Sequence, residues 1–192
     1  MNKKVEIQNQ KLVFERAIFT IMEGQYRHKL KSNQWSEPIF RLNLKRKDAV
    51  AVLVHNIDTN ELIFTEQFRY PTFEKTDGWI LELPAGMIDE GEEPLDAVKR
   101  EMMEEIGYVI NEAKHLQTFY LSPGTSSERI FLYYAQVRNS DQKNEGGGLV
   151  EEGEFITIIS INIDKVLNSL NSGAITDAKT IIGLQWLQKS KP

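Results

Sequence analysis

Apolar residues fall along this chain mainly in short runs that are rich in β-branched and aromatic side chains. Turn-forming residues separate the runs, and this pattern predicts β-strands. Residues 49–55 and 62–65 flank a loop of turn formers at 56–60, which predicts a hairpin. The complete set of predicted strands is 12–20, 39–44, 49–55, 62–65, 79–83, 116–121, 130–137 and 155–161.

Three segments space their apolar residues as a helix does. The first is expected to begin near Pro94 and to end near Gly107, because proline fits the first turn of a helix and glycine the position after it. Two more helices are expected over 164–171 and 177–188. Strands around one central helix, followed by two terminal helices, predict an α+β fold in an α/β/α layered arrangement. The glycine-rich segment 139–148 is interpreted from composition as a spacer, with an active-site loop as the alternative.

The composition is typical of one soluble globular domain. Of the 192 residues, 41% are hydrophobic and 27% charged, and no apolar run approaches the roughly 18 residues that a membrane span needs. The N-terminus has basic residues without a continuous apolar stretch behind them, so we expect a cytoplasmic protein that does not bind membranes. Cysteine is absent, which excludes disulfides, thiolate nucleophiles and cysteine-bound zinc. Any metal must bind through oxygen or histidine.

Acidic residues are concentrated in one segment. The net charge is only −5, from 23 basic and 28 acidic residues, but nine acids and two bases lie between Glu82 and Glu105. The overall balance argues against a nucleic-acid partner. The acidic segment is either a solvated helix face or a site whose counter-charge comes from a bound divalent cation.

Helical geometry favours the cation site. At about 100° per residue, Glu101, Glu104 and Glu105 lie on one face of the predicted central helix, beside its apolar face. Like charges at this spacing destabilise a helix, whereas carboxylates so placed can jointly bind Mg²⁺ or Mn²⁺. Arg100 can pair with Glu104 or with a carboxylate on a neighbouring strand such as Glu82.

The helix and the loop before it form a motif of fixed spacing. Its polar and glycine positions are Gly86, Glu92, Arg100, Glu101, Glu104, Glu105 and Gly107. This motif resembles the Nudix box, with Tyr108 where the family prefers an aliphatic residue. The resemblance implies a Nudix α/β/α sandwich with a mixed sheet and a pyrophosphohydrolase that uses Mg²⁺, with Mn²⁺ as the alternative. The three box glutamates at 101, 104 and 105 and the carbonyl of Ala85 would hold the ion.

Segments outside the box resemble the ADP-ribose pyrophosphatase branch of the family. Pro123 lies fifteen residues after the end of the box, as in that branch. Arg69 and, by a looser alignment, Arg41 would bind a substrate phosphate. Glu152 would be the general base on a mobile loop, with Glu154 as the alternative. The candidate site residues are Glu152, Glu154 and Arg100 for catalysis, Ala85, Glu101, Glu104 and Glu105 for the metal, and Arg69, Arg41, Glu82, Gly86 and Pro123 for the substrate.

The same resemblance implies a homodimer. Residues 1–46 would be a β-rich segment exchanged between subunits, and residues 47–192 the Nudix hydrolase domain. Tyr26, Trp35 and Phe40 are available to stack on adenine, with core packing as the other reading. The three histidines are scattered without metal-ligand spacing and are interpreted as structural.

The expected reaction is Mg²⁺-dependent hydrolysis of ADP-ribose to AMP and ribose 5-phosphate. A nucleotide sugar such as GDP-mannose is the alternative substrate. A non-catalytic Nudix ligand sensor is disfavoured because such proteins lose box carboxylates, and an RNA-processing hydrolase because no basic and aromatic stripe is present.

Overall fold

The computed structural model describes residues 4–190, which form two compact units. The first, here called the sheet unit, contains the chain up to Asp48 together with Tyr120–Arg129. The second, here called the core unit, contains residues 49–119 and the chain from Ile130 onward. None of the helices in the part of the chain that the structure describes is long and apolar enough to cross a membrane.

The core unit is built on a mixed sheet. Its strands run in the order β10-β5-β4-β9-β8, with β6 paired to β5 and β7 paired to β4. Strand β4 is parallel to β9 and antiparallel to β5 and β7. The strands are β4 (Ala49–Asn56), β5 (Glu61–Phe68), β6 (Trp79–Glu82), β7 (Ala85–Met87), β8 (Lys114–Tyr120), β9 (Arg129–Val137) and β10 (Thr157–Asn162).

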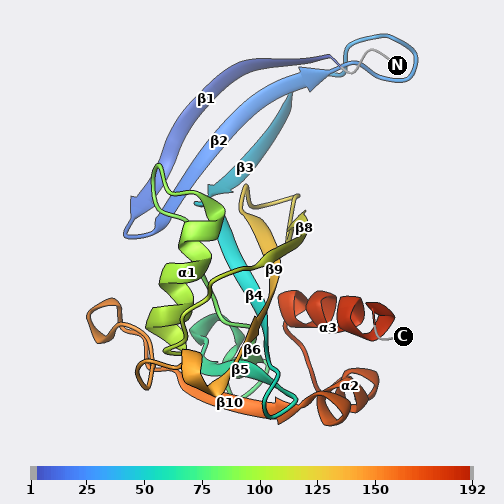
Figure 1. The fold of residues 1–192 in the computed structure, drawn as a ribbon. Coiled ribbons are helices and arrows are strands. Elements are labelled where there is room, and N and C mark those ends of the chain that lie inside the picture. The colour runs from blue at the N-terminus through green and yellow to red at the C-terminus, as the bar shows by residue number, and fades with distance from the viewer. Residues whose placement is uncertain (1–3, 191–192) are drawn as a thin grey trace. The chain divides into compact units, whose positions relative to one another are not determined.

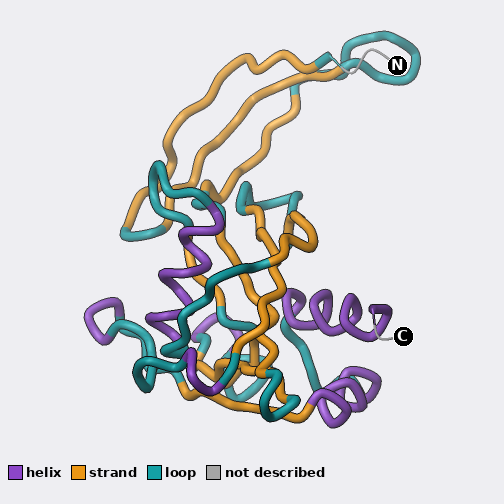
Figure 2. The backbone as a smooth tube through the Cα atoms, viewed as in Figure 1, coloured by secondary structure: helices purple, strands orange, loops and turns teal. Residues whose placement is uncertain are grey.

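Helices cover both faces of this sheet (Figures 1 and 2). The helices are α1 (Pro94–Glu105), α2 (Ile163–Ser172) and α3 (Ala178–Ser190). Val52 of β4 packs in one apolar cluster with Val98 of α1, whereas the next residue, Leu53, packs in the other with Leu184 of α3. Because successive side chains of a strand point to opposite faces, a strand covered on both sides must be apolar throughout. The predicted α+β fold with α/β/α layers is therefore confirmed.

Most predicted helices and strands are present. The differences lie where the residue types show only a weak preference for a turn or a strand. The run 12–20 is not one strand, because a turn at Ala17 and Ile18 divides it between β1 (Val5–Arg16) and β2 (Phe19–His28). Neither residue is a usual turn former, and Ala17 adopts a left-handed φ of 50° that alanine rarely takes. Residues 85–87, interpreted as loop, form the short strand β7 against β4. Residues 4–190 also contain short 3₁₀ turns at Tyr70–Thr72, Asn139–Asp141 and Val150–Glu152.

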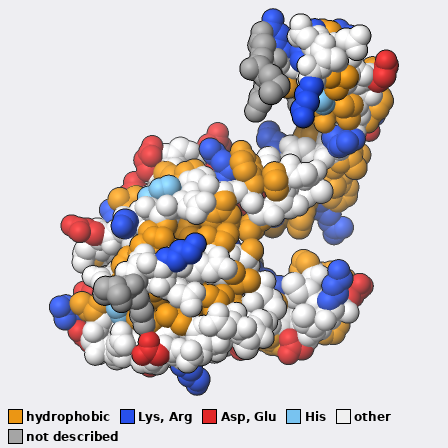
Figure 3. Space-filling model, turned by 90° about the vertical axis from the view of Figure 1, so that its right-hand side faces the viewer, with side chains coloured by type: hydrophobic (Ala, Val, Ile, Leu, Met, Phe, Trp, Pro, Cys, Tyr) orange, Lys and Arg blue, Asp and Glu red, His pale blue; other side chains and the backbone are white. Residues whose placement is uncertain are grey.

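The sheet unit is a three-stranded antiparallel sheet in the order β1-β2-β3, with β3 spanning Ile39–Lys45. The backbone N–H of Leu44 donates to the carbonyl of Thr125 (2.8 Å), which ties the 120–129 loop to β3. No residue from 4 to 48 is buried. In the space-filling view, apolar side chains are exposed on the surface of this unit (Figure 3). The large exposed apolar residues are Val5, Ile7, Leu12, Val13, Phe14, Ile18, Phe19, Leu30, Phe40 and Leu42.

Candidate active site

Helix α1 presents its acidic residues to strand β7. Glu101 and Glu105 are buried, with 7% and 3% of their surface exposed, and Glu104 is half-buried. The fit depends on Gly86, because a Cβ atom there would lie 1.9 Å from Cδ of Glu101. Only glycine lets the carboxylate approach the backbone so closely. The glycine of the motif therefore belongs to the same site as the glutamates.

Arg100 binds several of the acidic residues at once. Its Nε and Nη2 donate to the two carboxylate oxygens of Glu92, each at 2.9 Å. Its Nη1 donates to Glu101 (2.7 Å) and to Glu104 (3.3 Å), and Nη2 also donates to the carbonyl of Met87 (2.9 Å). The hydrogen bonds that Arg100 donates to Glu92 have a larger effect than burial, which opposes them, and they raise the pKa of Arg100. Arg100 thus fixes the loop before α1 against the helix.

Arg100 pairs with Glu104, as one of the two alternatives expected. The other alternative, a pair between Arg100 and Glu82, is wrong. The carboxylate of Glu82 is bound by Arg69 Nε at 2.6 Å and by Lys179 Nζ at 3.0 Å. Glu82 therefore pairs with Arg69 and Lys179 and is not among the carboxylates that Arg100 binds.

Burial disfavours the ionised forms of Glu101 and Glu105 more than their protein partners favour them. Burial raises the pKa of Glu101 to about 7; Arg100 opposes the shift, and the charges of Glu104 and Glu154 add to it. Burial also raises the pKa of Glu105, although the backbone N–H of Ala85 donates to its Oε2 at 2.9 Å. A buried carboxylate with a raised pKa is stabilised by any cation placed beside it.

The donor set fits a hard divalent cation. It consists of carboxylate oxygens beside a backbone that glycine leaves accessible, which is the chemistry that Mg²⁺ and Mn²⁺ prefer. Within residues 4–190, no three His, Cys, Asp or Glu side chains are already arranged around one metal position. Glu101 and Glu104 are instead both in contact with the guanidinium of Arg100.

The glycine-rich segment is not a spacer. The backbone N–H of Gly147 donates to the carbonyl of Glu105 (2.9 Å), and that of Gly148 to the carbonyl of Glu104 (3.1 Å). These carbonyls are at the end of α1, where helical partners are lacking. A Cβ on Gly146 would lie 2.5 Å from the carbonyl oxygen of Glu105, so the contact needs glycine. We call Gly146–Gly148 the glycine strap.

The strap leads into the loop that carries the two candidate bases. Glu154 is half-buried, its Oε2 accepts a hydrogen bond from the N–H of Leu149 (3.1 Å), and its charge contributes to the raised pKa of Glu101 and of Glu105. Glu152 ends a 3₁₀ turn, and its side chain lies outside the described part of the structure. Which glutamate is the base therefore stays a prediction.

A second group of charges lies at the end of β6. Glu82 bridges Arg69 and Lys179, and Lys179 also binds Asp177 (2.8 Å). Sequence reasoning missed Lys179, because nothing near it in the sequence marks it as a partner of Glu82. The available signal was Asp177 just before a helix, a position that favours capping.

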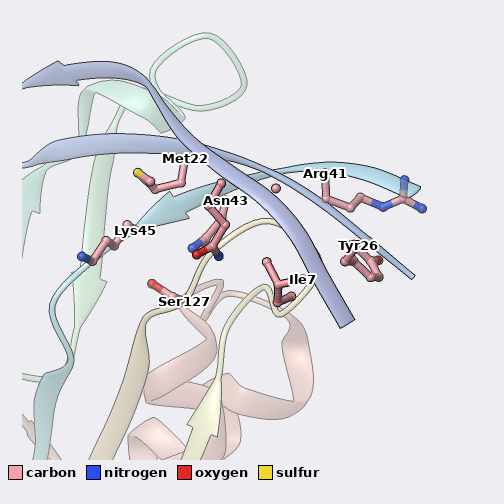
Figure 4. A pocket seen from close by; sticks show the side chains of 9 residues that line it. Ile7, Met22, Tyr26, Arg41, Asn43, Lys45 and Ser127 are labelled. Atoms are coloured by element: carbon pink, nitrogen blue, oxygen red, sulfur yellow. The ribbon is translucent and has the colours of Figure 1, made fainter. Parts of the chain in front are cut away.

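Two predicted substrate residues lie in the sheet unit. Arg41 lines a hollow of about 430 Å³ together with Tyr26, Met22 and Asn43 (Figure 4). Pro123 is exposed in the loop between β8 and β9. Their roles toward a substrate stay predictions.

The remaining aromatic and histidine candidates have local partners. Trp35 lies under the cations of Arg27 and Lys29, and Phe40 is 57% exposed, so it is not a core residue of this chain. Tyr108, the atypical last position of the box, is buried in the apolar cluster of α1. The ring nitrogens of the histidines contact Lys29, Tyr134 and Thr118.

Comparisons with known proteins agree with this geometry. A family model described as the NUDIX domain matches residues 45–181. The ADP-ribose pyrophosphatase of Escherichia coli (strain K12) is 32% identical over 176 residues, which cover 90% of this chain and 83% of the relative. The ADP-ribose pyrophosphatase of Haemophilus influenzae is 32% identical over 188 residues, 96% of this chain and 86% of the relative. The GDP-mannose pyrophosphatase of Cronobacter sakazakii is 35% identical over 145 residues, 74% of each chain.

The resemblance of the box is thus supported by a match over most of the chain. It is further supported by a buried carboxylate site at the positions that the box defines. This chain belongs to the Nudix family and is a Nudix hydrolase.

Proposed function

We propose that this protein hydrolyses the diphosphate of ADP-ribose to AMP and ribose 5-phosphate with Mg²⁺, or with Mn²⁺ in its place. The observation that carries the proposal is the pair of buried glutamates, Glu101 and Glu105, on a helix whose loop and charges belong to a Nudix box. ADP-ribose is preferred because the ADP-ribose pyrophosphatases align over 90% or more of the chain, whereas the GDP-mannose pyrophosphatase aligns over 74%.

The roles of the residues follow from their chemistry. Glu101, Glu104 and Glu105, with the carbonyl of Ala85, would hold the ion. A bound Mg²⁺ supplies positive charge to the diphosphate and acidifies a coordinated water. Arg100 keeps the box loop against α1 through its contacts with Glu92 and with the carbonyl of Met87.

Arg69 would bind a substrate phosphate. Its side chain is 42% exposed although its Nε is engaged by Glu82, and a guanidinium can direct further N–H groups at phosphate oxygens. Arg41 and Pro123 would also bind the substrate. Gly86 would contribute by leaving room for Glu101.

We propose Glu152 as the general base that takes the proton of the attacking water, with Glu154 as the alternative. A base on a loop suits this chemistry, because water activation then depends on loop closure over the substrate. Glu152→Gln should lower kcat by about a thousandfold or more if it removes the proton. A larger loss in Glu154→Gln than in Glu152→Gln would transfer the role to Glu154.

The second candidate is a GDP-mannose pyrophosphatase activity. It is favoured by a relative of that name with 35% identity. The two proposals are separated by measuring AMP release from ADP-ribose and GMP release from GDP-mannose at equal Mg²⁺ concentration. A higher kcat/KM for GDP-mannose would overturn the first choice, and no hydrolysis of either would overturn both.

We also propose that the active protein is a homodimer. Residues 4–48 bury none of their own side chains, and their exposed apolar residues are numerous. A sheet of this kind gains stability when apolar surface on another chain covers it. Exchange of residues 1–46 between subunits would provide that cover and bring the sheet unit of one chain to the site of its partner.

A further inference from the structure

A closed ring of contacts joins the start of α3 to the end of β6. Lys179 Nζ donates to Glu82 Oε2 (3.0 Å) and to Asp177 Oδ1 (2.8 Å). The other oxygen of Asp177 accepts from the backbone N–H and the hydroxyl of Thr180, at 2.9 and 2.7 Å. The hydroxyl of Thr180 in turn accepts from the backbone N–H of Leu83 (2.9 Å), so the ring returns to the neighbour of Glu82.

The ring is buried. Thr180 has no exposed surface, and only 12% of the Lys179 side chain and 5% of the Glu82 side chain are exposed. Burial disfavours the charge of Lys179, but the carboxylates of Glu82 and Asp177 more than offset it and raise its pKa. Charges held in this way are screened little by water or salt, so their attraction is stronger than that of exposed ion pairs.

The ring controls which oxygen of Glu82 is open to Arg69. Arg69 meets Glu82 through Nε and Oε1, whereas Oε2 accepts from Lys179. An arginine and a carboxylate otherwise favour a two-pronged contact in which two nitrogens bind two oxygens. With Lys179 on Oε2, the guanidinium retains its other N–H groups for a ligand.

We propose that Lys179 is a positioning residue for substrate binding: by occupying one oxygen of Glu82, it keeps Arg69 oriented toward a substrate phosphate. The proposal rests on the proposed function, in which Arg69 binds the diphosphate. Lys179 acts through Glu82 and need not touch the substrate. Loss of Lys179 leaves Oε2 of Glu82 free. Arg69 then forms a bidentate contact with Glu82 and turns away from the phosphate.

The test is a double-mutant cycle of Lys179→Met and Arg69→Met, with kcat and KM measured on ADP-ribose at saturating Mg²⁺. We expect Lys179→Met to raise KM about tenfold and to change kcat less than about threefold, because it removes phosphate binding and not the metal site. In the Arg69→Met background the same change should raise KM less than about twofold. Lys179→Arg, which keeps a donor to Oε2, should recover most of the KM.

Two controls separate positioning from folding. Lys165→Met changes an exposed lysine of α2 and should leave both kinetic constants within about twofold. Asp177→Asn keeps the volume of the ring and removes one of the two charges on Lys179, so it should raise KM by a smaller factor than Lys179→Met. An equal rise of KM from Lys179→Met with and without Arg69 would overturn the proposal, since a merely structural lysine acts equally in both backgrounds.

A crystal structure of Lys179→Met provides a readout without activity. We expect two nitrogens of Arg69 on the two oxygens of Glu82. Retention of the contact through Nε alone would contradict the proposal. Failure of the wild-type enzyme to hydrolyse any nucleotide sugar would overturn the proposed function instead, while the structure would still decide how Lys179 orients Arg69.

Discussion

The two units of this protein differ in how far their strands are buried. In the core unit, both faces of the sheet are covered by helices of the same chain, and β4 is buried along almost its whole length. In the sheet unit, three strands are paired by backbone hydrogen bonds, yet no residue from 4 to 48 is buried. Strand pairing therefore orders the sheet unit without giving it a buried core. Its apolar side chains stay exposed, so they are available for contact with another chain.

The largest expected effect comes from removing charge at the buried acidic site. Glu101→Gln and Glu105→Gln should each lower kcat by about a thousandfold or more, because an amide is a poorer metal ligand than a carboxylate. Melting temperatures in EDTA should stay equal or rise, since each substitution removes a buried charge. Glu6→Gln is the matched change in the sheet unit, where Glu6 pairs with Arg27 at the surface, and it should leave kcat unaltered. Wild-type kcat in both box variants would remove the metal assignment.

Truncating the core unit should come next in size. Phe64 has no exposed surface, so Phe64→Ala should cost about 3–5 kcal/mol and lower the melting temperature by roughly 6–20 °C. Leu42 of the sheet unit is 57% exposed in the single chain. The destabilisation from Leu42→Ala should be smaller and should depend on protein concentration, as thermal unfolding of a dilution series will show. An effect of Leu42→Ala that is independent of concentration would contradict the contrast between the units.

The acidic site should also make metal-free stability depend on pH. The pKa of Glu101 is raised to about 7 and that of Glu105 is raised as well, so the folded state holds protons that the unfolded state releases near pH 4.5. The contribution of these two groups to the free energy of unfolding in EDTA should therefore be greatest below about pH 4.5. It should fall as the pH rises to 8, by about 3–4 kcal/mol from Glu101 alone at 1.4 kcal/mol per pKa unit.

Mg²⁺ should reverse that loss, because it binds the ionised carboxylates. Denaturant titrations at several pH values, with EDTA and with Mg²⁺, measure both effects. Glu101→Gln is the control, since it should remove the part of the pH dependence that Glu101 contributes. A metal-free protein that gains stability between pH 5 and 8 would disprove the electrostatic account of the site.

The smallest effect is expected in the association of two chains. Phe40 and Leu42 are two residues apart on β3 and are both 57% exposed, so they lie on one face of the sheet. Replacing both with serine should weaken the proposed dimer at least about tenfold, which light scattering over a dilution series measures. Asn43→Ser, on the opposite face beside the hollow, serves as the control. A wild-type chain that is monomeric at all concentrations would refute the proposed dimer.

The elements that the sequence predicts are those with strong local signals. The hairpin of β4 and β5 has turn formers between two apolar runs, and α1 begins at Pro94 and is followed by Gly107 in a left-handed conformation. The turn at Ala17 escaped prediction because neither of its residues prefers a turn. The acidic face of α1 was predictable because its spacing is set within one helix.

Contacts between distant segments could not be predicted in this way. Lys179 and Glu82 are 97 positions apart, and nothing near Glu82 in the sequence indicates that its cations are Arg69 and Lys179 and not Arg100. The glycine strap looks like a spacer by composition, since its function depends on carbonyls contributed by α1 some forty residues earlier. The family match supplies the register that local patterns lack.

The glycine strap has a consequence for how this enzyme can diversify. The N–H of Gly147 binds the end of α1, and the carbonyl of Gly147 accepts a hydrogen bond from the N–H of Ile156 at 3.1 Å. Gly147 therefore holds both ends of the loop 148–155. Residues of this loop other than Glu152 and Glu154, the two candidate bases, can then be exchanged while the carboxylates of α1 keep their places. We expect exchanges that retain both glutamates to alter substrate range without disturbing the fold, which makes the rest of this loop the natural place to re-engineer the enzyme.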